Sequence, residues 1–111
     1  MGLGPQFSLE TDRIGGNDVV AVRGEVDLAT APRLDTALKK FSGQEVFLDL
    51  RGVDFMDSAG LKVLISHRHR IETSGGALRV VLGEGPVMRL LELSGVRDTF
   101  AIRPKIDALD T

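Results

Sequence analysis

The chain has 111 residues, a length typical of one small domain. It carries no cysteine, which excludes a disulfide framework and thiolate chemistry, and its formal net charge of −2 disfavours electrostatic binding of nucleic acid. No apolar run approaches the roughly 18 residues needed to span a bilayer, and the first residues do not resemble a signal peptide. We therefore expect a cytoplasmic protein with neither a membrane nor a nucleic-acid partner.

The first half of the chain predicts a β-hairpin, a helix and a strand. Apolar residues alternate with polar ones over 7–11, and a second strand-like run, 19–22, follows turn-forming residues at 15–18. Thr30 is suited to cap a helix that Gly43 stops, because Leu34, Ala37, Leu38 and Phe41 fall on one face. Residues 46–50 then predict a short strand. Its one charge, Asp49, lies either at an edge of the sheet or inside as a hydrogen-bonded carboxylate.

The second half predicts two further helices and at least one further strand. The spacing of apolar residues indicates a helix that begins near Ser58 and ends at 75–76, a strand over 78–82, and a helix from Pro86 to 94–95. A last short strand over 99–102 is a further option. The order β-β-α-β-α-β-α predicts a single α/β domain, 1–111, with a small, mostly parallel sheet, an N-terminal hairpin and helices packed on it. We expect residues 1–6 to be a loose N-terminus and 103–111 a C-terminal tail.

One serine stands at the predicted strand-to-helix junction, in the sequence Asp57-Ser58-Ala59-Gly60. Ser58 could cap the helix with its hydroxyl, which would make it a structural residue. It could be a nucleophile, but Met56 occupies the place of the first glycine of a Gly-x-Ser-x-Gly elbow. His67 would stand about 13 Å further along the helix, which is too far for a hydrogen bond to Ser58. Pattern alone favours a cap or a modified serine over catalysis.

A modified serine fits the chemistry of this junction. A phosphate on Ser58 would gain from the free N–H groups and the positive dipole at the start of a helix, and it would add about −1.5 to −2 charges. Asp54 and Asp57 are close in sequence, so the new charge would meet like charges. We expect the fold to persist while a partner docked at this edge is repelled.

Two other features of this helix have a structural and a functional interpretation. Val63 could form a small contact surface with Ala59, Lys62 and Ser66 beside Ser58, although lone exposed valines are common. The run 67–70 alternates histidine and arginine, but residues two apart on a helix point about 200° apart, so the histidines cannot share one metal ion. A solvated helix face is the expectation for this run.

The whole set of motifs resembles the STAS domain family, and within it the bacterial anti-sigma factor antagonists. The resemblance covers nearly the whole chain, and it depends on the order and spacing of several weak motifs. They are 24–27 with 30–32, Asp49-Leu50, 55–61, Gly75-Gly76, 78–81 and 87–95. The resemblance implies a regulatory phosphoprotein and not an enzyme. Unphosphorylated, it binds an anti-sigma factor that is often also its serine kinase, and it thereby frees a sigma factor for transcription.

The resemblance also implies a site. Carried onto this chain, the phosphorylation acceptor is Ser58, a metal-dependent serine phosphatase reverses the modification, and ATP belongs to the kinase, so no cofactor is expected here. Ala59 and Lys62 depart from the Ser/Thr and Gly that many relatives have; Lys62 could pair with a phosphate, pair with a partner carboxylate, or be solvated. The expected partner-binding residues are Asp27, Asp57, Ala59, Gly60, Lys62 and Val63. The alternative is a scaffold or transporter-associated STAS domain without a phosphorylation switch.

Overall fold

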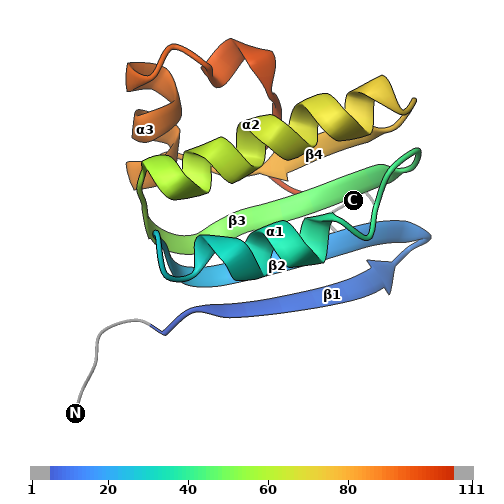
Figure 1. Cartoon of the computed structure of the whole chain (residues 1–111), viewed down its shortest axis with the longest axis horizontal. Coiled ribbons are helices and arrows are strands. Elements are labelled where there is room, and N and C mark those ends of the chain that lie inside the picture. Colours follow the sequence, from blue (N-terminus) through green and yellow to red (C-terminus); the bar gives the residue numbers. More distant parts are fainter. Residues whose placement is uncertain (1–5, 107–111) are drawn as a thin grey trace.

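The computed structural model describes residues 6–106, which form a five-stranded sheet with helices packed against it (Figure 1). In chain order the elements are β1 (Ser8–Ile14), β2 (Asn17–Val26), α1 (Ala31–Leu38), β3 (Glu45–Met56), α2 (Ser58–Thr73), β4 (Ala77–Val81), α3 (Pro86–Leu93), a 3-10 turn (Arg97–Thr99) and β5 (Ala101–Arg103). The predicted α/β class and the optional last strand are thereby confirmed.

The predicted hairpin is present at the N-terminal edge of the sheet. β1 pairs antiparallel with β2 from Ser8 opposite Arg23 to Ile14 opposite Asn17. The turn between the strands is formed by Gly15 and Gly16, whose φ angles of +58° and +83° suit glycine better than any other residue.

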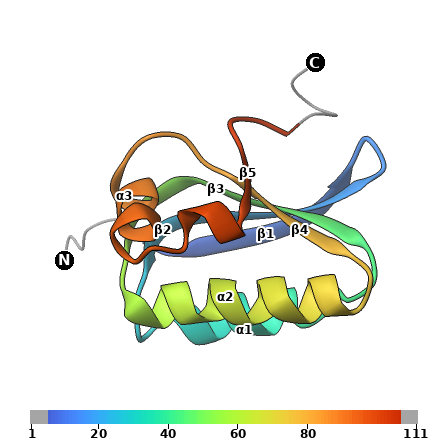
Figure 2. The same cartoon turned by 90° about the horizontal axis from the view of Figure 1, so that it is seen from above.

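The helices α1 and α2 lie on one face of the sheet because of its strand order (Figure 2). The order is β1-β2-β3-β4-β5, and each of the pairs β2–β3, β3–β4 and β4–β5 is parallel. Each crossover therefore moves one strand further in the same direction, and right-handed crossovers then place all their helices on the same side. Figure 2 shows α1 and α2 together on one side of the sheet, while the chain after β5 runs to the other side.

The main core fills the space between the sheet and the helices. Alternate residues of the central strands point into it, as the two-residue period of a strand requires. Its fully buried members include Val20, Val22, Val46, Leu48 and Leu50 from the sheet and Leu34, Leu38, Leu64, Ile71 and Leu91 from the helices. Leu34 and Leu38, predicted on the inner face of the first helix, are therefore part of this core.

The opposite face of the sheet carries a smaller apolar cluster of Val19, Phe47, Val81 and Ile106. Asp49 follows Phe47 by two residues in β3, so it points to the same side, where the Arg51 guanidinium contacts its carboxylate at 3.0 Å. β3 is the middle strand, so the sequence alternative of a charge at the sheet edge is wrong. Asp49 is a partly buried, paired carboxylate.

Two predicted element boundaries need correction. β3 does not stop at residue 50 but continues to Met56, because Gly52 lies at an irregularity of the β2–β3 register and does not end the strand. The helix α1 ends at Leu38, and the next residues close it with tighter bonds from Lys40 N to Ala37 O and from Phe41 N to Leu38 O. Phe41 still packs against the core from outside the helix.

Within the described residues, the unstructured ends of the chain are shorter than the sequence predicted. Arg103 belongs to β5, opposite Val81, and Ile106 is buried, so 103–106 is not a loose tail. At the other end, the Gln6 backbone lies so close to Gly24 that a side chain at Gly24 would collide with it. The predicted loose residues 1–5 and tail residues 107–111 lie outside the described residues.

Candidate functional site

The junction between β3 and α2 is organised by Asp57. Its Oδ1 accepts hydrogen bonds from the backbone N–H groups of Ala59 (2.9 Å) and Gly60 (3.3 Å), so Asp57 is the N-cap of α2. Its own N–H donates to Val26 O at 3.2 Å, which ties the junction to the end of β2. The interpretation of Ser58 as the helix cap is therefore wrong, because the neighbouring aspartate performs that function.

Ser58 is the first residue of α2, and it is exposed. Within the described part of the chain, its hydroxyl makes no hydrogen bond. A hydroxyl without a structural role, at the solvent-facing start of a helix, is available to a modifying enzyme or a binding partner.

Gly60, two residues after Ser58, is buried. A Cβ at this position would stand 2.7 Å from Met56 Cγ and 2.8 Å from a methyl carbon of Val26, so only glycine allows this close approach of α2 to the strands. This burial gives Gly60 a packing role. Because Gly60 is buried, the structure gives no support to its predicted direct contact with a partner.

The loop between β2 and α1 stands beside this junction, because Val26 and Met56 are paired in the sheet. Asp27 Oδ1 accepts from the N–H groups of Ala29 (3.0 Å) and Thr30 (3.1 Å). Thr30 Oγ1 accepts from Asp27 N at 2.9 Å and donates to Glu25 O at 2.8 Å, so its side chain fixes this loop and does not cap α1 as predicted. The fixed loop holds Leu28, whose side chain is 78% exposed.

A groove of about 350 Å³ runs between the first halves of α1 and α2, next to Ser58. It brings together the predicted contact residues Ala59, Lys62, Val63 and Ser66 with residues from the α1 side that the sequence did not single out. These are Leu28, Ala31, Pro32 and Asp35. Of these four, only Leu28 could have been noticed in the sequence. It is an apolar residue in the short segment between Asp27 and Thr30, where a helix was predicted to begin. The sequence does not show which side of α1 contacts α2.

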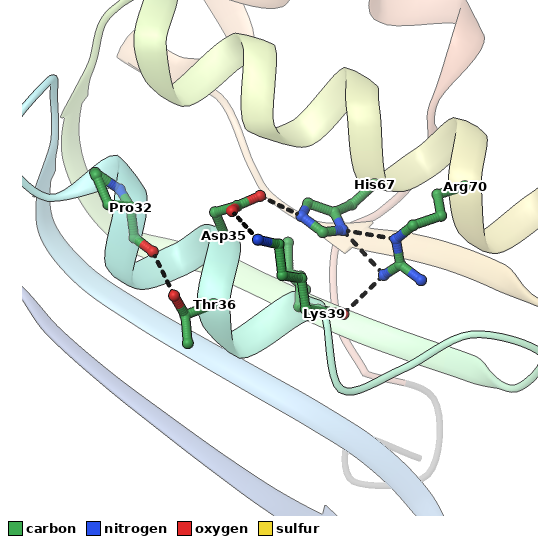
Figure 3. A network of polar contacts seen from close by, with 7 residues as sticks. Pro32, Asp35, Thr36, Lys39, His67 and Arg70 are labelled. Carbon is green, nitrogen blue, oxygen red and sulfur yellow. Dashed lines mark hydrogen bonds and ion pairs between the residues drawn. The ribbon is translucent and has the colours of Figure 1, made fainter.

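Further along the two helices, a polar network joins α1 to α2 (Figure 3). Asp35 Oδ1 lies 2.7 Å from His67 Nε2, and Arg70 donates to His67 Nδ1 from Nε (3.2 Å) and Nη2 (2.9 Å). Arg70 Nη2 also donates to Leu38 O at 2.9 Å. Because a guanidinium can only donate and a carboxylate only accept, we infer that His67 is neutral with its proton on Nε2.

This network corrects the expectation of a solvated face over 67–70. His67 is 2% exposed, whereas His69, two residues on, is exposed. The sequence rule failed because α1 packs against this side of α2 and supplies a carboxylate that satisfies the imidazole.

The same network sets the charge of Asp35. The hydrogen bond from His67 lowers the pKa of the Asp35 carboxyl, and Lys39, whose Nζ lies 3.2 Å from Oδ2, lowers it further, while partial burial opposes both. Asp35 therefore presents a stable negative charge on the α1 side of the groove.

The arrangement does not suit acyl-transfer catalysis. Both nitrogens of His67 are engaged, one with Asp35 and the other with Arg70, so this imidazole is not free to act as a base for Ser58. Between residues 6 and 106, no group of three or more potential metal ligands converges, and no described helix is long and apolar enough to cross a membrane. Exposed hydroxyl, groove and flanking charges are instead features of a contact surface.

Comparison with known proteins places the chain in a family. The STAS domain matches residues 8–109, so the chain belongs to the STAS domain family. Its relatives there include an anti-sigma F factor antagonist of Paenibacillus polymyxa, which is 32% identical over 105 residues, covering 91% of this chain and 87% of the relative.

Solved structures agree with this assignment. An anti-sigma factor antagonist from Mycobacterium paratuberculosis superposes with a TM-score of 0.80 at 30% identity, covering 94% of this chain and 92% of that one. SpoIIAA, solved in unphosphorylated and phosphorylated forms, gives TM-scores of 0.68 and 0.64 at 20% identity; these pairs cover 95% of this chain and 94% and 97% of SpoIIAA. At that identity the likeness to SpoIIAA concerns the fold alone.

Proposed function

We propose that this protein is a bacterial anti-sigma factor antagonist that binds an anti-sigma factor when Ser58 is unmodified and releases it when Ser58 is phosphorylated. The observation that carries the proposal is the exposed, unbonded hydroxyl of Ser58, next to a cap supplied by Asp57. Membership of the STAS domain family and the similarity to anti-sigma factor antagonists support the same function.

The partner surface extends from Ser58 into the groove between α1 and α2. Leu28, Ala59 and Val63 offer apolar contact area there, while Lys62 and Asp35 place opposite charges on its two sides. An anti-sigma factor that covers this surface must remove water from Ser58. Asp27 and Asp57 are proposed to act mainly by holding the two loops of the surface in place.

Phosphorylation would oppose such binding through charge. The Ser58 oxygen attacks the γ-phosphorus of ATP, ADP leaves, and the hydroxyl proton passes to the kinase, which is proposed to be the anti-sigma factor itself. The product adds about −1.5 to −2 charges beside Asp54 and Asp57. Burying this dianion under a partner costs desolvation free energy without changing the core. A metal-dependent serine phosphatase would restore the hydroxyl, and both reactions are proposed to occur in the cytoplasm, where transcription is controlled.

The direct test is to locate the phosphate. The purified chain is incubated with Mg-ATP and each purified anti-sigma factor kinase of the source bacterium, and the product is mapped by mass spectrometry. We expect one phosphate, on Ser58, with the Ser58→Ala variant unmodified but still bound by the kinase. Phosphate on another residue, or equal labelling of Ser58→Ala, would overturn the proposed switch.

A further inference from the structure

Lys62 stands one helical turn after Ser58, on the same side of α2. Residues four apart on a helix are neighbours, and helical side chains lean toward the N-terminus, so the Lys62 ammonium can reach back over the first turn. Lys62 is exposed and lines the groove, and within residues 6–106 it forms no ion pair. It is therefore free to change partner when the charge at residue 58 changes.

Lys62 is the cation on the same helix and the same side as residue 58; Arg89 of α3, the other cation near this end of β3, lines a different groove with Phe55 and Met56. Asp54 and Asp57, at the end of β3, and Asp27, in the neighbouring loop, are all acidic. Across the groove, Asp35 is already paired with His67 and Lys39. The order acid at i and base at i+4 is the favourable orientation along a helix, because it also agrees with the helix dipole.

We infer that Lys62 pairs with the phosphate of phosphoserine 58, so that phosphorylation also withdraws a positive charge from the groove. This inference rests on the proposed modification of Ser58 and deepens it. The groove would then keep the negative charge of Asp35 and lose the cation opposite it. A partner group that faces Lys62 in the unmodified complex is accordingly acidic. Phosphorylation would weaken its binding in two ways, by repulsion from the phosphate and by loss of its ion pair with Lys62.

The experiment needs no partner protein. Phosphoserine is placed at residue 58 during translation, by suppression of a stop codon, in the full chain and in two variants. In Lys62→Gln the proposed counter-ion is removed; in Lys40→Gln the same charge is removed beyond the far end of α1. The pKa of the phosphate is measured by a ³¹P NMR titration, and the ε-methylene resonance of Lys62 is followed over the same pH range.

The expected result is a phosphate pKa about 0.3 units higher in Lys62→Gln than in the parent chain, the size of an exposed i,i+4 ion pair. In Lys40→Gln we expect a shift below about 0.1 units, because the charge lies beyond the range of strong interaction. The Lys62 methylene resonance should titrate with the same midpoint as the phosphate. Equal phosphate pKa values in the parent chain and Lys62→Gln would overturn the inference. Because no kinase is used, this outcome is distinct from failure of the kinase to modify Ser58.

Discussion

The contact between α1 and α2 has two parts that use charge in opposite ways. In the clamped half, defined by Asp35, His67 and Arg70, the three side chains are joined by hydrogen bonds and the imidazole is buried. In the open half, defined by Leu28, Ser58 and Lys62, the hydroxyl and the ammonium have none among the described residues, and an apolar side chain faces water. If the open half binds the partner as proposed, this one helix pair separates stability from recognition along its length.

The largest expected effect comes from breaking the clamped half. His67→Ala would leave the Asp35 carboxylate and the Arg70 guanidinium without their shared partner and create a cavity, so we expect a loss of about 2–3 kcal/mol in the free energy of unfolding. His69→Ala is the matched control, because that side chain is exposed and should change stability by less than about 0.5 kcal/mol. Urea denaturation measures both values, and similar losses in the two variants would contradict the assignment of a clamp.

The second effect concerns recognition in the open half. Leu28→Ala should leave the free energy of unfolding unchanged within about 0.5 kcal/mol but weaken binding of the cognate anti-sigma factor about tenfold, because an apolar contact is lost. Leu93→Ala is the comparison, since this side chain is equally exposed (80% against 78%) but lies on α3, outside the groove. Surface plasmon resonance measures the affinity of the anti-sigma factor for the parent chain and for each of the two variants. Equal affinity of Leu28→Ala and the parent chain would remove the groove from the binding surface.

A third prediction separates the two neighbouring residues of the junction. Asp57→Ala removes the cap of α2 and should cost about 1 kcal/mol of stability, whereas Ser58→Ala should stay within about 0.5 kcal/mol of the parent. Thermal denaturation of the pair shows which residue holds the helix. If the Ser58 variant proved the less stable, its hydroxyl would be a structural group after all.

The smallest expected effect is a pH dependence in the clamped half. The pKa of Asp35 is lowered in the folded state, so its ionised form stabilises the fold above the unfolded pKa, and this contribution is lost as the pH falls through the lower folded pKa. Between pH 7 and pH 3, the parent chain should therefore lose more unfolding free energy than Asp35→Asn does. Asp54→Asn, which removes an exposed carboxylate, should behave like the parent. Identical pH profiles for the parent and Asp35→Asn would show that the bonds of Asp35 to His67 and Lys39 do not stabilise the fold.

The fold was largely predictable because local patterns agree with the global arrangement. Period-two and period-3.6 apolar spacing predicted the helices and strands, and the Gly15–Gly16 turn predicted the hairpin. The errors fall where tertiary contacts override a local rule. The apolar run 46–50 predicted a short strand, but β3 continues through a register irregularity at Gly52, and Arg103 was predicted in the tail but pairs with β4.

Of the groove lining, helical spacing could predict only the side formed by α2. Ser58, Ala59, Lys62 and Val63 follow from helical spacing within one element. Their neighbours across the groove belong to α1 and the preceding loop, and no pattern in a single sequence states which side of α1 faces α2. The same limit explains why His67 was expected in solvent, since its partner Asp35 is 32 residues away in the chain.

The most direct test of the account is the affinity of one anti-sigma factor for two forms of this chain. The cognate anti-sigma factor is titrated by isothermal calorimetry into the full chain with serine or with phosphoserine at residue 58. The account predicts that the phosphorylated form binds at least about thirtyfold more weakly while melting at the same temperature. Affinities that agree within about threefold would contradict the central claim that Ser58 controls a contact surface.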